Sequence, residues 1–344
     1  MKRIISLVGL LCCGLWSAVA EQPVTTLQHA GKTTLFYGNS SFVDAYNSAS
    51  NGDTLMLSPG GFSVPAIQKG LVVIGSGHFP DSANVKRRTF LTNDVEIYKG
   101  SDGLYMEGIY LNNIHFNGNR ENGDTIRNIS FKRCRCEKIN CNVKNSDGFG
   151  PYGDGFDLEE CYIISQIQGT EYHFKMRNNV VFSTQNLIFS EKNAILENNI
   201  ILHDDITGEN GNVDNNILLY SGDLYTVSGD GMTGYNNMFL LGARIIFSSE
   251  NNYYAKDSSV FVKYSNSIDY EKNTEEIYKQ DFHLKDPSKY IGTDGTQIGI
   301  YGGVHAAKEG AAPFNPQILS KSVAPKIDAD GKLKISFKVA AQSE

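Results

Sequence analysis

Three loops hold the residue types from which a sugar-binding site is built. The first, NVKNSDGFGPYGDGFD at residues 142–157, carries aspartates and aromatic residues together: Asp147, Phe149, Tyr152, Asp154, Phe156 and Asp157. Carboxylate oxygens accept hydrogen bonds from sugar hydroxyls or ligate Ca²⁺, and aromatic rings cover the apolar face of a sugar. A Gly-rich surface loop without a ligand has the same composition, so both interpretations stay open.

The second loop, HDDITGENGNVD at residues 203–214, is acidic. Its candidate Ca²⁺ ligands are Asp204, Asp205, Glu209 and Asp214. The third loop, SGDLYTVSGDGMTGY at residues 221–235, adds Asp223 and Tyr225 to the candidate ligand-binding residues. A solvated acidic turn is the alternative for the second loop, and no cofactor is required by any motif.

A repeated asparagine doublet indicates the scaffold that must position these loops. NN or another polar pair precedes an apolar run eight times, with second members at Asn113, Arg133, Glu160, Asn179, Asn199, Asn216, Asn237 and Asn252. The gaps range from 15 to 27 residues and average about 20, a period typical of a solenoid. Short β-branched and aromatic runs broken by Gly, Asp and Asn favour strands and turns, so we predict an all-β parallel β-helix.

The doublets also predict an internal amide ladder. Asn tolerates the left-handed backbone that a bend between strands needs. Stacked side chains about 4.8 Å apart can donate to one coil and accept from another. We expect the second member of each pair to point inward, which assigns the ladder to Asn113, Asn179, Asn199, Asn216, Asn237 and Asn252.

The cysteines follow the same repeat. Cys134 comes after Arg133 and Cys161 after Glu160, so the two thiols should lie one above the other, within disulfide range. Their redox state stays open, as does that of Cys136 and Cys141. The spacing of the four cysteines does not complete a zinc site.

The N-terminal region predicts a capping helix, because Phe42, Ala45, Tyr46 and Ala49 recur at helical spacing. The helix, the run GDTLMLSPGGF and the later LVVIGSG together resemble the start of the pectate-lyase-like, right-handed parallel β-helix superfamily. The closing segment DFHLKDPSKYIGTDGTQIGIYGG resembles that of exported Bacteroidetes-type β-helix proteins of unassigned activity. The resemblance covers roughly residues 34–305 and implies a right-handed β-helix, but no single activity.

The resemblance also implies a place for catalysis. Polysaccharide lyases of the superfamily use a basic residue to remove the C5 proton of a uronic acid. Here His173, Lys175 and Arg177 alternate with Phe174 and Met176, so a strand would put the basic trio on one face. A glycosidase needs two separated carboxylates, and the adjacent Asp204 and Asp205 would point to opposite faces of a strand.

The chain ends complete the expected organisation. Residues 1–20 read as a signal peptide with a basic start and cleavage near Ala20, which predicts a periplasmic or extracellular protein. Residues 21–305 form the β-helix with its cap. Residues 306–344 form a linker and a β-hairpin, whose turn is expected at Asp330 and Gly331.

Charge and hydropathy restrict the partners. Without Lys2 and Arg3 the chain keeps 29 basic residues against 38 acidic ones, which argues against nucleic acid. No apolar stretch after the signal is long enough to span a membrane. We therefore expect a monomer that binds a polysaccharide or surface glycan without catalysis, with a polysaccharide lyase or glycosidase as the alternative.

Overall fold

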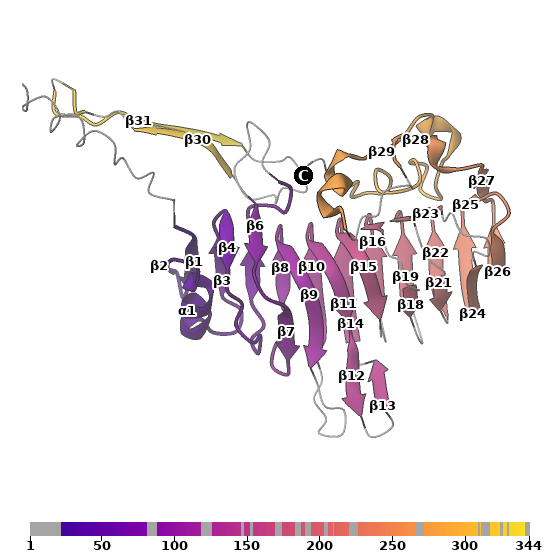
Figure 1. The fold of residues 1–344 in the computed structure, drawn as a ribbon, viewed down its shortest axis with the longest axis horizontal. Helices are drawn as coiled ribbons and strands as arrows, with labels where there is room; N and C mark the ends of the chain where they lie inside the picture. Colours follow the sequence, from indigo (N-terminus) through magenta and orange to yellow (C-terminus); the bar gives the residue numbers. More distant parts are fainter. Residues whose placement is uncertain are drawn as a thin grey trace, which may run out of the picture.

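The computed structural model describes residues 22–80, 88–117, 126–145, 148–151, 154–168, 174–182, 187–189, 194–202, 206–208, 210–219, 226–265, 272–308, 310, 317–323, 326–328 and 330–340. Most of its strands lie in two long, largely parallel sheets that run side by side along an elongated body (Figure 1). The protein is therefore an all-β parallel β-helix, as its repeat predicts. The expected signal peptide lies outside the described residues.

Sheet A has 14 strands. Its order along the solenoid begins with an antiparallel hairpin and continues with parallel strands. The strands are β2 (Lys32–Tyr37), β1 (Val24–His29), β3 (Thr54–Leu57), β5 (Val72–Ile74), β8 (Tyr105–Glu107), β10 (Arg127–Lys132), β14 (Asp154–Glu159), β16 (Phe174–Arg177), β19 (Ala194–Glu197), β22 (Gly211–Asp214), β24 (Thr226–Tyr235), β21 (Ile206–Gly208) and β18 (Leu187–Phe189), with β26 (Arg244–Glu250) on β24.

Sheet B has 11 strands, all in parallel pairings. They are β4 (Gly60–Phe62), β6 (Thr89–Leu91), β9 (Tyr110–Asn117), β11 (Arg135–Asn140), β15 (Tyr162–Gln168), β17 (Val180–Val181), β20 (Ile200–Ile201), β23 (Ile217–Leu218), β25 (Met238–Leu240) and β27 (Tyr253–Ala255), with β7 (Val95–Tyr98) on β9. A small antiparallel pair, β12 (Asn142–Asn145) and β13 (Gly148–Pro151), projects from the solenoid (Figure 1).

The core is built from side chains stacked coil on coil. Strand register in sheet A aligns one inward apolar residue from each coil: Leu55, Val73, Met106, Phe131, Leu158, Met176, Leu196 and Val213. All eight are at most 1% exposed. Alternation along each strand sends the intervening polar residues outward, which is why one run of sequence serves both core and surface.

The two members of each asparagine doublet have different tasks. The first member takes the left-handed backbone between a sheet A strand and a sheet B strand, with φ between +54° and +60° at Asn178, Asn198, Asn215, Asn236 and Asn251. The second member points inward. Asn accepts the positive φ at low cost, so the doublet is a two-residue corner of the coil.

The inward members form a continuous ladder. The Nδ2 group of Asn179 donates to Asn199 Oδ1 (3.0 Å), that of Asn199 to Asn216 Oδ1 (2.9 Å), and that of Asn216 to Asn237 Oδ1 (3.1 Å). Each oxygen also accepts the backbone N–H of the previous rung, and Asn252 closes the series by accepting from the Asn237 N–H (3.2 Å). Buried amides are thereby satisfied by one another.

In two coils the predicted alignment is wrong by one residue. Arg133 and Glu160 have φ of +50° and +54°, so they occupy the left-handed position of the first asparagine. The ladder position belongs to the next residue, Cys134 or Cys161. The Cys161 N–H donates to Asn179 Oδ1 (2.8 Å), and the Cys134 N–H lies 3.4 Å from Cys161 Sγ. The two sulfurs thus continue the ladder as free, buried thiols.

The assignment of Asn113 to the ladder is also wrong. Asn113 lies within β9, opposite Lys138, and its Nδ2 group donates to Asp94 Oδ1 (3.2 Å). In that coil Gly108 has the positive φ, and Ile109 follows it at the ladder position. A doublet inside a strand resembles a corner in sequence, because both precede apolar residues.

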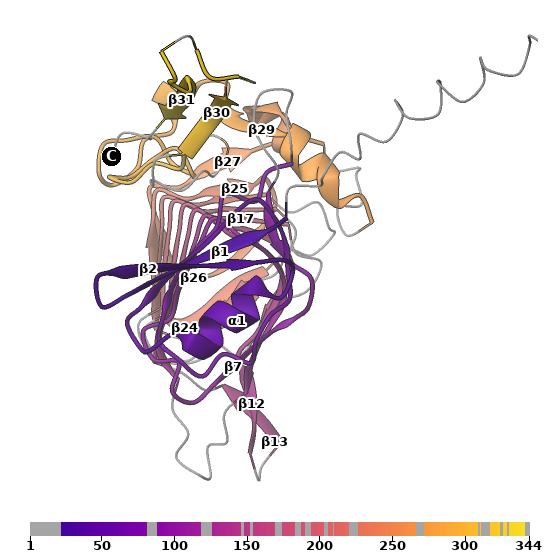
Figure 2. The same cartoon turned by 90° about the vertical axis from the view of Figure 1, so that its left-hand side faces the viewer.

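Helix α1 (Ser41–Ser48) caps the N-terminal end of the solenoid with its buried Phe42, Ala45 and Tyr46 (Figure 2). The C-terminal hairpin is present but begins earlier than expected. Strand β30 (Gln317–Val323) pairs with β31 (Ile335–Ala340), so Asp330 and Gly331 lie in a long connection between the strands, where the Gly331 N–H donates to the Asp328 carbonyl (3.0 Å) in a local turn.

Candidate functional site

A C-terminal segment, residues 272–308, folds back along the corners of the coils and is called the strap here. It contains the 3₁₀ helices η3 (Thr274–Lys279) and η4 (Pro287–Lys289) and strand β29 (Asp281–Leu284). Strand β29 pairs antiparallel with β28 (Phe261–Lys263), which follows the 3₁₀ helix η2 (Ser258–Val260). The strap packs a second hydrophobic core against the outer face of sheet B. Its apolar residues there are Ile277, Phe282, Leu284, Ile298 and Ile300.

Three of the first asparagines of the doublets hold the strap. Asn178 Nδ2 donates to the carbonyls of Ile300 and Gly302 (both 2.9 Å). Asn215 Oδ1 accepts from the Thr293 N–H (2.8 Å), and Asn236 Nδ2 donates to the Ile291 carbonyl (2.8 Å). The second asparagine of a doublet therefore builds the ladder, and the first can anchor the strap.

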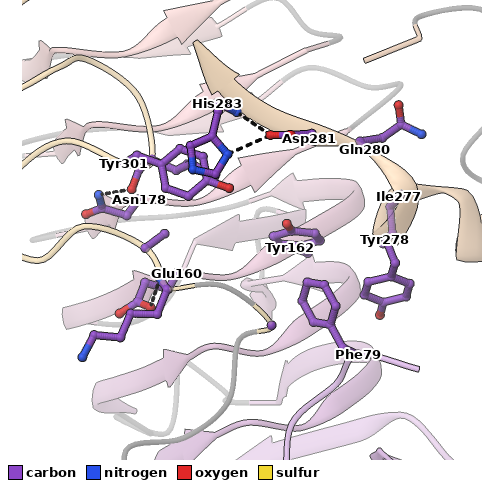
Figure 3. Close-up of a pocket in the computed structure, with 14 residues that line it drawn as sticks. Phe79, Glu160, Tyr162, Asn178, Ile277, Tyr278, Gln280, Asp281, His283 and Tyr301 are labelled. Atoms are coloured by element: carbon purple, nitrogen blue, oxygen red, sulfur yellow. Dashed lines mark hydrogen bonds and ion pairs between the residues drawn. The ribbon is translucent and has the colours of Figure 1, made fainter. Parts of the chain in front are cut away.

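A cavity of about 260 Å³ lies between the strap and the solenoid (Figure 3). We call it the strap pocket. Its walls come from three distant parts of the chain: Phe79, then Glu160, Tyr162 and Asn178, then residues of the strap and its continuation, namely Ile277, Tyr278, Gln280, Asp281, His283, Ile300, Tyr301, Ala307, Lys308 and Gly310.

Aromatic rings form much of the pocket wall. The imidazole of His283 stacks on the ring of Tyr301, with centroids 3.8 Å apart and an interplanar angle of 10°. On the other side, Phe79 packs against Tyr278 at 4.7 Å and against Tyr162 at 5.7 Å. Figure 3 shows these two groups of rings facing the space between them. Such rings offer flat apolar surface next to polar edges.

The polar groups of the pocket are held by neighbours. Asp281 accepts the backbone N–H of His283 (3.0 Å) and lies 2.8 Å from its Nδ1 atom. Burial opposes ionisation of the Asp281 carboxyl, but these hydrogen bonds and the nearby imidazole outweigh it and lower its pKa. Glu160 makes a bidentate ion pair with the buried Arg133 (both 3.1 Å), and Arg133 also pairs with Glu107. The pocket therefore presents acceptors in fixed positions.

His78 lies beside the aromatic wall, against the rings of Phe79 and Tyr278. His78 is fully buried, and its Nδ1 atom is 3.2 Å from the Tyr278 hydroxyl, which donates to the His78 carbonyl (3.1 Å). Burial and the charges of Arg135 and Arg88 lower the pKa of His78 to about 3. His78 therefore stays neutral and fixes Tyr278 in the pocket wall.

The basic side chains predicted for catalysis, Lys175 and Arg177 of β16, lie on the outer face of sheet A. Register places Lys175 beside Asp157, and it places Arg177 between Glu159 and Glu197. Arg177 Nε lies 2.8 Å from Glu197, and Lys132 Nζ lies 2.7 Å from Glu159. The charges alternate from coil to coil, an arrangement that stabilises the sheet through cross-strand pairs.

Two carboxylates from the predicted loops lie on the same face. Burial is the main cause that raises the pKa of Asp157, against the opposing effect of Lys175 and Arg177. Burial also raises the pKa of Asp214, whose Oδ1 atom accepts the Tyr235 N–H (2.8 Å). The structure thus brings Asp157, Lys175, Arg177 and Asp214 onto one surface.

Phe156 is not a sugar-facing ring. It lies inside the solenoid, 6% exposed, stacked on Phe174 with centroids 5.8 Å apart. Alternation along β14 sends Phe156 inward and Asp157 outward. Several other candidates lie outside the residues or side chains that the structure describes: Asp147, Phe149, Tyr152, Asp154, His173, Asp204, Asp205, Glu209, Asp223 and Tyr225.

Within the described ranges there is no cluster of three metal-ligating side chains, and no helix there is long and apolar enough to cross a membrane. No protein-family model matches the chain, and no curated protein or solved structure matches it significantly. Sequence patterns did not predict the strap pocket, because its residues are more than 200 positions apart at the extremes. Gly302 and Gly303 mark close packing of the strap, because a Cβ atom there would clash with Gln297 or Asn198.

Proposed function

We propose that the protein binds a glycan in the strap pocket and acts as a binding protein rather than an enzyme. One observation carries the proposal: two groups of aromatic rings and the fixed acceptors Asp281 and Glu160 line the same cavity. A sugar ring presents an apolar face and a rim of hydroxyls, and such a site meets both. The cavity volume of about 260 Å³ suits one or two sugar units rather than a long embedded chain.

The polar groups favour an uncharged sugar. Asp281 has a lowered pKa and is ionised at neutral pH, so it repels a uronate and accepts from hydroxyls. The same proposal includes export directed by the N-terminal segment and membership of the pectate-lyase-like superfamily. An exported protein would meet an extracellular or periplasmic glycan.

The test is binding to an array of neutral and acidic oligosaccharides, followed by calorimetry on the retained sugars. Tyr301→Ala removes the ring that stacks on His283 and should weaken binding at least about tenfold, since aromatic contacts dominate small binding sites. Tyr37→Ala is the matched control, because Tyr37 is 61% exposed on β2 at the capped end. Equal affinity of the two variants would contradict the proposal.

A polysaccharide lyase on sheet A is the second candidate, favoured by the placement of Lys175 beside a half-buried carboxylate of raised pKa, Asp157. Its signature is ultraviolet absorbance from an unsaturated uronate product, abolished in Lys175→Ala. The ion pair of Arg177 with Glu197 argues for a structural role of that arginine.

A further inference from the structure

The two ends of the solenoid are finished differently. At the N-terminal end, α1 and the β1–β2 hairpin cover the first coil (Figure 2). At the other end, β26 pairs with β24 and with no other strand that the structure describes (Figure 1). One edge of β26 is thus left without a strand partner, and such an edge readily accepts another strand.

The last coil also exposes apolar surface. Ile246 on β26 is 45% exposed, Tyr254 on β27 is 57% exposed, and Leu241, in the connection between β25 and β26, is 69% exposed. Ile245 and Phe247 point to the other face of β26 and pack against the core while only partly buried. Within the part of the chain that the structure describes, the hydrophobic core therefore reaches this end without an apolar cap like the one that α1 supplies at the other end.

The sequence of β26, RIIFSSE, is complementary to itself in antiparallel pairing about Phe247. On the exposed face, Arg244 would lie opposite Glu250 and Ile246 opposite Ser248. On the core face, Ile245 would lie opposite Ser249, and Phe247 opposite its own copy. Both ends of the strand would thus place opposite charges together, whereas a slip of one residue would separate them and reverse the faces.

We propose that a second copy of the chain docks at this end, with the two β26 strands pairing antiparallel across a two-fold axis. The contact is isologous, so each Arg244–Glu250 pair occurs twice. The two solenoids then form one longer rod with an α1 cap at each outer end. This differs from the monomer that composition alone suggests.

A charge-reversal cycle in sedimentation velocity tests the proposal on the full mature chain. The wild type should dimerise, and Arg244→Glu or Glu250→Arg should each weaken dimerisation about tenfold or more, because two like-charge pairs replace two opposite ones. The double variant should restore it. Lys32→Glu, an exposed charge reversal at the capped end, should dimerise like the wild type.

Three results would overturn the proposal. If the wild type stays monomeric up to millimolar concentration, a second copy does not use the edge of β26, and that edge is left to a strand of another protein. A dimer unaffected by either single reversal would use another surface. A double variant as weak as the single ones would exclude the antiparallel register. Because Arg244 and Glu250 are both exposed, the thermal unfolding of the monomers should be unchanged and serves as the folding control.

Discussion

Replacing Asn199 by alanine removes four buried hydrogen bonds from the centre of the ladder. Its Oδ1 atom accepts from Asn179 N and Nδ2 (both 3.0 Å), and its Nδ2 group donates to Asn216 Oδ1 and the Met176 carbonyl (both 2.9 Å). The Asn179 backbone N–H would be left buried without this acceptor, which costs about 1–3 kcal/mol. Three further bonds at about 0.5–1.5 kcal/mol each bring the expected loss to roughly 2.5–7.5 kcal/mol.

The neighbouring residue supplies the control. Asn198 has φ of +56°, which glycine adopts freely, and its buried Oδ1 atom has no hydrogen-bond partner among the residues that the structure describes. Asn198→Gly should therefore change the free energy of unfolding by less than about 1 kcal/mol. Chemical denaturation followed by circular dichroism measures both variants. Similar losses at the two positions, or a loss below about 1 kcal/mol at Asn199, would refute the division of tasks within the doublet.

Three further predictions concern buried ionisable groups. His78 has a folded-state pKa of about 3, below its ordinary value of 6.5, so between these values the unfolded chain binds a proton and the folded chain does not. Acidification to about pH 4.5 should therefore cost roughly 2–3 kcal/mol of stability that is present above pH 6.5. His78→Asn should flatten this part of the pH profile in thermal unfolding. Arg133→Met leaves the buried Glu107 without its cation and leaves Glu160 with Lys132 at 3.9 Å, and it should destabilise the fold by about 3–5 kcal/mol in denaturant titrations, a loss that addition of Glu160→Gln should partly recover. Burial raises the pKa of the Cys136, Cys141 and Cys161 thiols, so mass spectrometry should find them unalkylated in the native protein and all modified after unfolding; rapid native labelling would contradict their placement in the core.

The sequence predicts the solenoid well because its rules are local. A corner needs a residue that tolerates positive φ and an inward amide that can stack, so Asn178–Asn179 and its repeats recur at the period of one coil. The same local rules fail where another residue type occupies a corner that keeps the same backbone geometry. Arg133 and Glu160 take the left-handed backbone of the corner and pair with each other across coils, and no pattern of asparagines reveals that.

The strap pocket was beyond sequence reasoning for a different reason. Asn178 reaches Ile300 across 122 positions, and the side chain of His78 meets Tyr278 across 200. Such contacts depend on how the strap folds back, which no spacing rule encodes. By contrast, alternation along β14 and β16 correctly predicts that Lys175 and Arg177 share a face, and it could also have predicted that Phe156 points inward.

The most direct test of glycan binding is a crystal structure of the protein soaked with an oligosaccharide retained on the array. The proposed function predicts a sugar ring in the strap pocket, against the Tyr301–His283 stack and within hydrogen-bond distance of Asp281. A sugar bound instead over Lys175 and Asp157 on sheet A, with the pocket empty, would contradict it.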